Sequence, residues 1–389
     1  MLGKAARQTP PIWWKIRKTG KKTIGVLSPG YGLEKVSYSL MPNGFSYVKL
    51  NQIPFHRIFR TDNIFTQTNI VIGGGADLIH TFNTIPVNRP FVISFETELP
   101  RFLGHPTDWA IEFGYSMLQS SRCRGIYALS KAGRNFSAKR MRARGFADLA
   151  DQIQIFRGGI TIPQTDTFAN LRPLRGEIRA CFVGGHLFHK GIEAVIRATE
   201  QLRLHGIDIT LTVVGKCRDS TYAAPDVLFN GNQVLSKFDQ CSWITYYPQL
   251  PNAEILKLFF SHHLLFFPSI DESLGWVLVE AAMCGLPRIA TNIFAFPELI
   301  HHGRDGWMID IPLNDDRRWS FLGKPEAKDV WDDTQKFMSE RILDIFGDNN
   351  LSVEKLIEVG ATARDHINYL YGQDKARAQL ESIYESALK

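Results

Sequence analysis

The chain has 389 residues, of which 44% are hydrophobic, and it carries 45 Lys and Arg against 39 Asp and Glu, a formal net charge of +6 at pH 7. This composition is ordinary for a globular protein, and the length exceeds what one hydrophobic core usually supports, so two domains are expected. No run approaches the ~18 apolar residues of a membrane-spanning helix, and the start does not read as a signal peptide. Five widely spread cysteines without a C-x-x-C pair argue for a reducing compartment and against a zinc site or disulfide framework.

The excess of positive charge lies at the N-terminal end. The first 33 residues contain seven bases and no acid, which leaves 38 bases against 39 acids in the rest of the chain. Trp13 and Trp14 lie between these bases, so residues 1–22 are interpreted as a basic, Trp-containing arm. Basic residues around adjacent tryptophans suit an anionic membrane surface. The alternative is a disordered, soluble leader, and the pattern favours neither.

Residues 23–168 are predicted to form a first Rossmann-like domain. Thr23 to Ser28 has the pattern of a buried strand and is followed by a loop with Gly30 and Gly32. A strand, a glycine loop and a helix open such domains, although a lone G-x-G is weak evidence because tight turns need glycine anyway. Further strands are expected at Ile70–Ile72, Leu78–Thr81, Phe91–Phe95, Gly125–Leu129 and Gln152–Phe156. Pro163 to Arg175 is the expected linker.

Residues 169–365 are predicted to form a second Rossmann-like domain. Ile178 to Val183 reads as a strand, Lys190 to His205 as an amphipathic helix, and Ile209 to Val214 as the next strand. A β-α-β unit of this kind predicts a parallel sheet. Gly184 to Gly191 is the connecting loop, and a lysine at the start of a helix is unfavourable unless an anion binds there.

Leu264 to Thr291 reads as a strand, a short acidic loop, a helix and another strand, with Glu272 in the loop and Glu280 in the helix. Eight residues of continuous helix would place the two acids roughly 80° apart around the axis and ~12 Å apart along it. That spacing prevents them from sharing a proton and lets them hold two parts of one ligand. The amides of Ser273, Leu274 and Gly275 at the helix start favour a phosphate. Alternatively, both acids are simply solvated.

The C-terminal part contains two more helical patterns, Val353 to Ala363 and Lys375 to Leu388. The polar stretch Asn314 to Asp333, with Trp319 and Trp331 interspersed, is interpreted as a surface excursion.

The second domain resembles the donor site of the retaining glycosyltransferase family four, which has the GT-B fold. The matching pieces are Glu272-Ser273-Leu274-Gly275, Glu280-Ala281, Gly285-Leu286-Pro287, Pro297-Glu298 and Gly303 to Gly306. The loop Gly184 to Gly191 is similar to the family's G-[RS]-x-x-x-x-K-G donor-phosphate loop. The resemblance implies an α/β chain of two Rossmann-like domains with parallel sheets facing across a cleft. It also implies that a C-terminal helix, residues 366–389, returns to the first domain.

The resemblance implies a role for each matching residue. Lys190 would neutralise a diphosphate together with the Ser273, Leu274 and Gly275 amides, Glu272 would orient the sugar through its hydroxyls, and Glu280 would hold the ribose. The glycine loop with Gly30 and Gly32 would border the acceptor and the donor phosphates. No cofactor is implied, and no metal either, because the chain contains no D-x-D.

Two positions depart from the family's pattern. Gly185 stands where an arginine often follows Gly184, so one cationic contact is missing, and His189 or His186 would partly replace it. Many relatives also place a histidine after the strand Phe91–Phe95. Here Glu96 occupies the approximate position, and His105 lies downstream as a second candidate, although such acids are also commonly part of a salt-linked surface turn.

Three functional hypotheses follow. The favoured one is a glycosyltransferase that moves a sugar from a nucleoside diphosphate sugar to a glycan or lipid-linked acceptor with retention of configuration, in surface polysaccharide or glycolipid synthesis. It would be cytoplasmic, with a peripheral contact to the membrane through residues 1–22 and no nucleic-acid partner. The second is a nucleotide-sugar epimerase, and the third is an inactive sugar-nucleotide-binding module.

Overall fold

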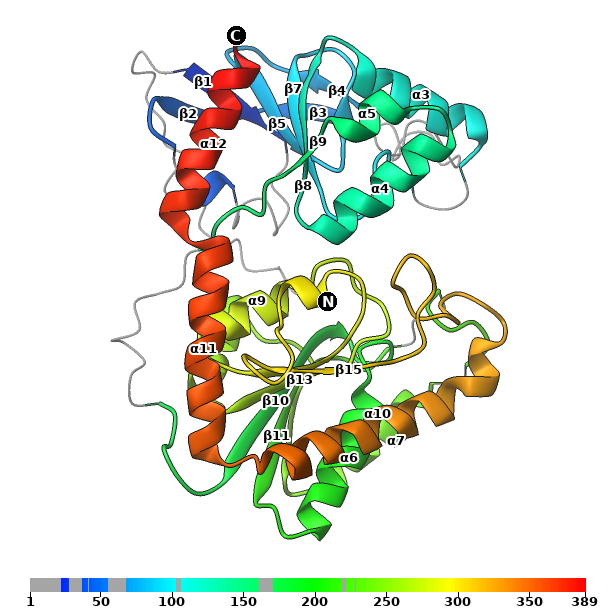
Figure 1. Cartoon of the computed structure of the whole chain (residues 1–389), viewed down its shortest axis with the longest axis vertical. Helices are drawn as coiled ribbons and strands as arrows, with labels where there is room; N and C mark the ends of the chain where they lie inside the picture. Colours follow the sequence, from blue (N-terminus) through cyan, green and yellow to red (C-terminus); the bar gives the residue numbers. More distant parts are fainter. Residues whose placement is uncertain are drawn as a thin grey trace, which may run out of the picture. The chain divides into compact units, whose positions relative to one another are not determined.

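The computed structural model describes residues 22–27, 37–40, 42–54, 68–102, 106–160, 171–218, 222–227 and 229–389. They belong to two compact units, each with a six-stranded sheet (Figure 1). Unit 1 comprises Met1–Thr161 and Tyr371–Lys389, and unit 2 comprises Ile162–Leu370. The predicted α/β class with parallel sheets is confirmed. Within the described ranges, no helix is both long and apolar enough to cross a bilayer.

The main sheet of unit 1 has the strand order β2-β1-β5-β7-β8-β9, and all of its pairings are parallel. Its strands are β1 Lys22–Val26, β2 Phe45–Lys49, β5 Leu78–Phe82, β7 Phe91–Phe95, β8 Cys123–Ala128 and β9 Ile153–Ile155. A small second sheet consists of β3 Asn51–Pro54, β4 Thr68–Ile72 and β6 Ile85–Pro86. The helices are η2 Tyr38–Leu40, α3 Asp108–Gln119, α4 Lys131–Ala143, α5 Ala147–Asp151 and α12 Gln373–Ala387.

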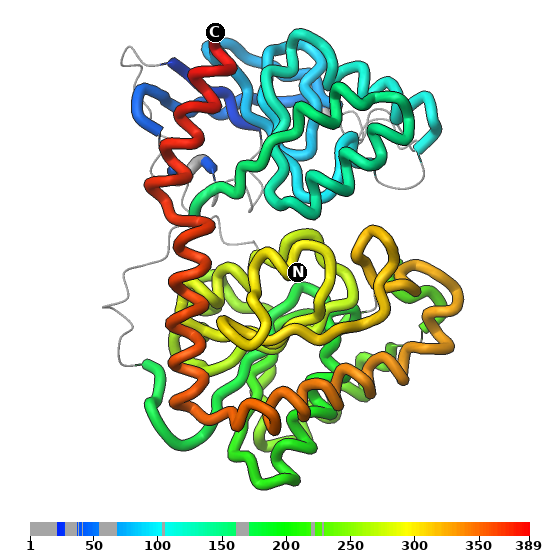
Figure 2. The backbone as a smooth tube through the Cα atoms, viewed as in Figure 1, coloured from blue at the N-terminus to red at the C-terminus, as the bar shows by residue number. Residues whose placement is uncertain are grey.

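The C-terminal helix α12 is part of unit 1 although it is the last element of the chain. Figure 2 shows this red helix beside the blue and cyan segments of the unit. Arg377 Nε donates to the Leu40 carbonyl at 2.8 Å, and the Gln379 side-chain amide donates to the Ile155 carbonyl at 2.8 Å. The expected return of the C-terminal helix to the first domain is therefore confirmed.

The sheet of unit 2 has the strand order β12-β11-β10-β13-β14-β15 and is also parallel throughout. Its strands are β10 Ile178–His186, β11 Ile209–Lys216, β12 Ile244–Tyr247, β13 Leu264–Phe267, β14 Arg288–Thr291 and β15 Trp307–Ile309. The helices are α6 Ile192–Leu204, α7 Gly231–Gln240, α8 Asn252–Ser261, α9 Trp276–Met283, η4 Phe296–Glu298, α10 Ala327–Asn349 and α11 Val353–Tyr371. All four residues of β13 are buried, as expected for a central strand covered on both faces.

The stretch Asn314 to Asp333 differs from the predicted surface excursion. Trp319 is fully buried, Trp331 is 6% exposed, and α10 already begins at Ala327. The Trp331 ring stacks on Phe188 with centroids 4.2 Å apart and meets Trp319 edge-on at 6.1 Å. The prediction was wrong for the two tryptophans, whose indoles anchor the stretch to the core of unit 2, although many of its other residues are exposed.

Candidate active site

The strand order of unit 2 reverses beside β10. From β10 the sheet extends to β11 and β12 on one side and to β13, β14 and β15 on the other. In open α/β sheets, ligands bind at such a reversal, beyond the carboxyl ends of the strands. The segment after β10 carries Lys190, and the loop after β13 carries Glu272. Two of the predicted site residues therefore follow the two strands that flank the reversal.

Lys190 and Glu272 form an ion pair. The Lys190 Nζ atom lies 2.6 Å from Glu272 Oε2 and donates a second hydrogen bond to the Asp271 carbonyl at 2.9 Å. Lys190 is only 8% exposed. A buried ammonium is tolerated when it is paired and hydrogen-bonded. The sequence identified both residues but not the contact between them, because they are 82 positions apart.

The two loops meet because the backbone at Gly191 is left-handed, with φ +81°. A Cβ atom at this position would lie 2.3 Å from the Pro268 carbonyl oxygen, so only glycine allows so close an approach. The Ile270 N–H donates to the His189 carbonyl at 3.0 Å across the same junction. The left-handed Gly191 also delays the helix, so α6 begins at Ile192 rather than at Lys190 as predicted.

Asp271 binds a second cation, Arg318, beside the contact between the Lys190 and Glu272 loops. Its carboxylate lies 3.2 Å from an Arg318 nitrogen and accepts a hydrogen bond from the Tyr222 hydroxyl at 3.2 Å. Its carbonyl accepts from Lys190 and from Ser269 Oγ. Arg318 and Lys190 thus both contact Asp271. The sequence did not indicate Arg318 as a site residue, because it lies in the stretch interpreted as a surface excursion.

The acidic loop differs from the expected helix start. The Ser273 N–H donates to Glu272 Oε1 at 3.0 Å, so this amide is engaged by the protein's own carboxylate. Gly275 has φ +81° and caps α9, which begins at Trp276. The separation of Glu272 and Glu280 calculated for a continuous helix was therefore wrong, because the chain is not helical from Glu272 to Gly275. Leu274 is buried.

Glu280 lies inside α9 and is 5% exposed, whereas the Glu272 side chain is 24% exposed. The two acids therefore differ in environment: Glu272 is accessible at the loop, and Glu280 belongs to the buried side of the helix. The proposed contact of Glu280 with a ribose stays a prediction.

The predicted loop of residues 184–191 is shorter than expected, because β10 continues through Gly184 and Gly185 to His186. Burial, together with the neighbouring Lys190 and His186, lowers the pKa of His189 to about 3. His189 is consequently neutral at physiological pH in the unliganded protein, and its role at the donor phosphates stays a prediction. A Cβ atom at Gly185 would have nothing within 4 Å, so this position has room for a larger side chain.

Unit 1 holds the remaining predicted residues. Glu96 directly follows β7, and its carbonyl oxygen would lie 2.2 Å from a Cβ at Gly133, in the first turn of α4. Gly30, Gly32 and His105 lie outside the described residues. His80 of β5 is hydrogen-bonded on both sides of its ring, because its Nδ1 lies 2.8 Å from the Tyr384 hydroxyl and its Nε2 lies 2.9 Å from Ser94 Oγ.

Comparison with known proteins places the Lys190 and Glu272 loops within a recognised family model. Residues 164–318 match the model described as Glycosyl transferases group 1. A D-inositol 3-phosphate glycosyltransferase from Paenarthrobacter aurescens is 29% identical over 197 residues, which are 49% of this chain and 45% of that protein. The same enzyme from Pseudarthrobacter chlorophenolicus is 28% identical over 137 residues, 35% of this chain and 31% of that protein. The matches thus span less than half the length of these relatives.

Solved structures agree with the fold of the whole chain. A glycosyltransferase from Rickettsia africae aligns with a TM-score of 0.59 at 14% identity, over 95% of this chain and all of that chain. The Anabaena protein HepE in complex with UDP-glucose aligns with a TM-score of 0.58 at 14% identity, over 94% of this chain and 99% of that chain. These alignments support the predicted GT-B fold.

Proposed function

We propose that this chain, whose residues 164–318 form a Glycosyl transferases group 1 domain, moves a sugar from a nucleoside diphosphate sugar to a glycan or lipid-linked acceptor with retention of configuration. The observation that carries the proposal is the Lys190–Glu272 pair, 2.6 Å apart, on the two loops that flank the strand reversal of unit 2. The transferred group is a hexose in surface polysaccharide or glycolipid synthesis.

The ion pair explains how the site is kept ready for an anionic ligand. Glu272 neutralises Lys190 when no donor is bound, and the Asp271 carbonyl holds the ammonium in position. A diphosphate competes with Glu272 for Lys190. The exchange leaves the Glu272 carboxylate able to accept hydrogen bonds from the hydroxyls of the sugar. A cation that is already in place stabilises the leaving group without reorganisation, which is the most effective form of electrostatic catalysis.

The transfer itself needs no protein nucleophile. The bond between C1 of the sugar and the diphosphate oxygen breaks, and the acceptor oxygen forms a new bond to C1 on the same face. The acceptor proton passes to the departing diphosphate oxygen. Lys190 stabilises the negative charge on the diphosphate, and Glu272 orients the sugar.

Three further residues complete the assignment. Arg318, whose side chain lies 3.2 Å from the Asp271 carboxylate, supplies a second cation. It replaces the arginine that often follows Gly184 in the family and is Gly185 here. Glu280 holds the ribose, so Glu280→Ala is expected to weaken nucleotide binding about tenfold with little change in kcat. Glu96, which directly follows β7 in unit 1, stays a catalytic prediction from the resemblance.

The experiment is a thermal-shift screen of nucleotide sugars followed by a transfer assay with the donor that binds. UDP sugars come first because HepE binds UDP-glucose, and inositol phosphate joins the acceptor panel because of the names of the two curated relatives. A donor that binds only the native state raises the melting temperature. Nucleotide release without an acceptor would indicate an epimerase, and tight binding without turnover would indicate an inactive module.

The proposal includes metal-independent donor binding and a peripheral position at the cytoplasmic face of a membrane. The shift in melting temperature caused by the nucleotide is expected to persist in EDTA. Residues 1–22 would bind anionic lipid, so deleting them should reduce sedimentation with phosphatidylserine vesicles and leave donor binding unchanged.

A further inference from the structure

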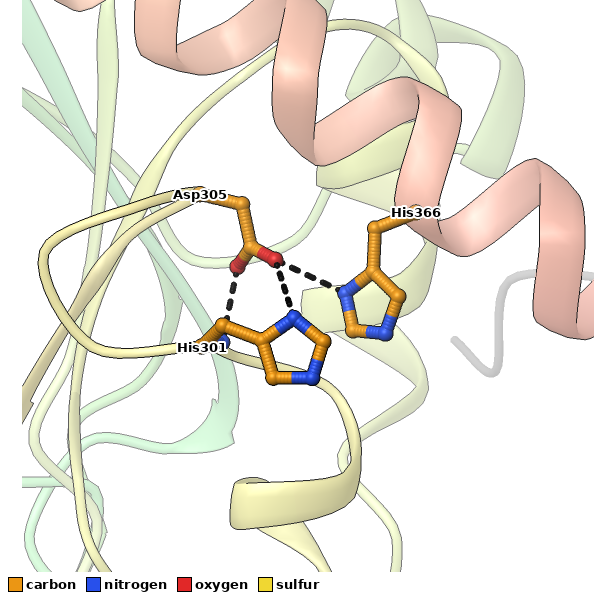
Figure 3. Close-up of side chains that lie close together, drawn as sticks. All are labelled: His301, Asp305 and His366. Carbon is orange, nitrogen blue, oxygen red and sulfur yellow. Dashed lines mark hydrogen bonds and ion pairs between the residues drawn. The ribbon is translucent and has the colours of Figure 1, made fainter.

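A second cluster of ionisable side chains lies in unit 2 apart from the residues assigned to the donor. His301 and Asp305 belong to the turn between η4 and β15, and His366 belongs to α11 (Figure 3). The Asp305 Oδ2 atom lies 2.8 Å from His366 Nδ1 and 3.3 Å from His301 Nδ1. Both imidazoles therefore direct a nitrogen to one carboxylate oxygen.

The two oxygens of Asp305 differ in their partners. Oδ1 accepts hydrogen bonds from the His301 N–H at 3.0 Å and from Arg288 at 3.3 Å. Oδ2 is buried and forms no hydrogen bond with any of the described residues, and the same is true of the His366 Nδ1 atom. The contacts of Oδ2 with the two imidazoles do not have hydrogen-bond geometry. The Asp305 Oδ2 and His366 Nδ1 atoms are thus in contact at 2.8 Å without a hydrogen bond between them, which needs an explanation.

We propose that His301, Asp305 and His366 bind a divalent ion of the zinc class. One ligand atom from each residue lies within 4.8 Å of the other two. Zinc binds imidazole nitrogen and carboxylate oxygen at about 2.0–2.2 Å in tetrahedral sites, so two of its ligands lie roughly 3.4 Å apart. The observed separations of 2.8 and 3.3 Å are close to this value. The His301 ring now stacks on His366 with centroids 4.1 Å apart, so the half-exposed His301 ring has to turn for both nitrogens to point at the ion. An ion there would also occupy the lone pairs of Oδ2 and of His366 Nδ1.

The surroundings determine how strongly the ion binds. The His301 side chain is 51% exposed, so solvent reaches one side of the cluster. The ion would enter from this side, and a water molecule would be its fourth ligand. Arg288 already balances the charge of Asp305 from the other side. Binding is therefore expected to be weaker than at structural zinc sites with four protein ligands.

The ion would join two parts of unit 2 that are far apart in the sequence. It would attach α11 to the turn before β15, at the edge of the sheet. The spacing of the cysteines argued against a zinc site, but the sequence does not indicate this cluster, because His366 is 61 positions from Asp305.

The test is calorimetric titration of the EDTA-treated, dialysed protein with ZnCl2, together with the melting temperature with and without zinc. We expect one ion per chain and a higher melting temperature with zinc. His301→Ala should weaken binding at least tenfold, and because His301 is half exposed this variant should fold. His366→Phe keeps an aromatic ring against His301, removes the ligand nitrogen and should lose the zinc-dependent shift.

The control is His186→Ala, which removes an exposed histidine from the end of β10 and should bind zinc as the wild type does. Co²⁺ provides an independent readout, because a tetrahedral site gives a visible absorption band that His301→Ala should abolish. Absence of zinc binding to the wild type at millimolar concentration would overturn the proposal. The same conclusion would follow if His301→Ala bound zinc with unchanged affinity.

Discussion

The two units place very different side chains at the point where their strand order reverses. In unit 1 the reversal lies between β1 and β5, and β5 carries His80 inside a buried network with Tyr384 and Ser94. In unit 2 the reversal lies between β10 and β13, and the segments that follow carry the Lys190–Glu272 ion pair. The architecture is shared, but the first arrangement is neutral and the second is charged.

The difference between the neutral network and the ion pair separates interactions that stabilise the fold from interactions that bind a ligand. A neutral network whose members are all hydrogen-bonded rigidifies a core. A largely buried ion pair such as Lys190–Glu272 contributes little net stability, because the desolvation of the charges offsets their attraction. The same pair is well suited to exchange partners with an anionic ligand. The fold alone does not assign the function, whereas the side chains at the reversal do.

The largest expected effect comes from breaking the ion pair of unit 2. Lys190→Ala and Glu272→Ala should each lower kcat/KM for transfer by about 10²–10³, the loss typical of one electrostatic contact to a developing anion. Because the two residues act as a unit, the double variant should be little worse than either single variant. Steady-state kinetics with a saturating acceptor measures the effect.

A matched control exists on the surface of the same unit. Lys237 Nζ lies 3.0 Å from Glu200 Oε2, between α7 and α6. Lys237→Ala and Glu200→Ala remove an ion pair of the same chemistry and should leave transfer unchanged. If Lys190→Ala retained the wild-type rate, the ion pair of unit 2 would have no role in transfer, and the functional distinction between the charged pair and the neutral network of unit 1 would be lost.

The neutral network of unit 1 gives the next effect. Tyr384→Phe removes the hydroxyl that lies 2.8 Å from His80 Nδ1 and 3.3 Å from the Tyr47 hydroxyl. Buried polar groups left without a partner should lower the free energy of unfolding by about 1–3 kcal/mol. Urea denaturation measures this loss. Tyr369→Phe, at a side chain that is 70% exposed, is the control and should be neutral, while the affinity for the nucleotide should not change in either variant.

The sequence predicted the buried elements better than the contacts between them. Phe91–Phe95 was predicted with the bounds that the structure has, because a central strand is a local apolar run. Lys190 and Glu272 were identified from local spacing, but their contact depends on how two distant loops pack. Arg318 was missed because a single arginine in a polar stretch has no local pattern that indicates its partner.

A further effect on stability, shared by both units, is expected at acid pH. Burial lowers the pKa of His80 to about 3, whereas an unfolded chain has a histidine pKa of about 6.5. The unfolded state therefore binds the proton first, and this contribution to stability is complete above pH 6.5 and is lost as the pH falls toward 3. At pH 5 the loss is about 2 kcal/mol.

His189 in unit 2, whose pKa is also lowered to about 3, should add a loss of similar size. Urea denaturation at pH 7 and pH 5 measures the sum. His80→Gln and His189→Gln should each flatten the pH dependence by roughly half, whatever they do to stability at pH 7. A pH dependence that neither variant changes would contradict the neutral state of both histidines.

The smallest expected effect is on nucleotide affinity, when a positive charge is added beside the ion pair of unit 2. Gly185→Arg introduces a cation at the end of β10, where a Cβ atom would have nothing within 4 Å. One additional exposed charge contact contributes roughly 0.5–1 kcal/mol, so nucleotide affinity should rise about two- to fivefold. Gly185→Gln has a long side chain without the charge, and it should leave the affinity unchanged.

Calorimetric titration with UDP distinguishes the two variants. The gain of the arginine variant should shrink at high salt, because screening weakens exposed charge contacts. A gain with glutamine as large as with arginine would mean that the contact is not electrostatic, and the diphosphate would then have to lie elsewhere than beside Lys190.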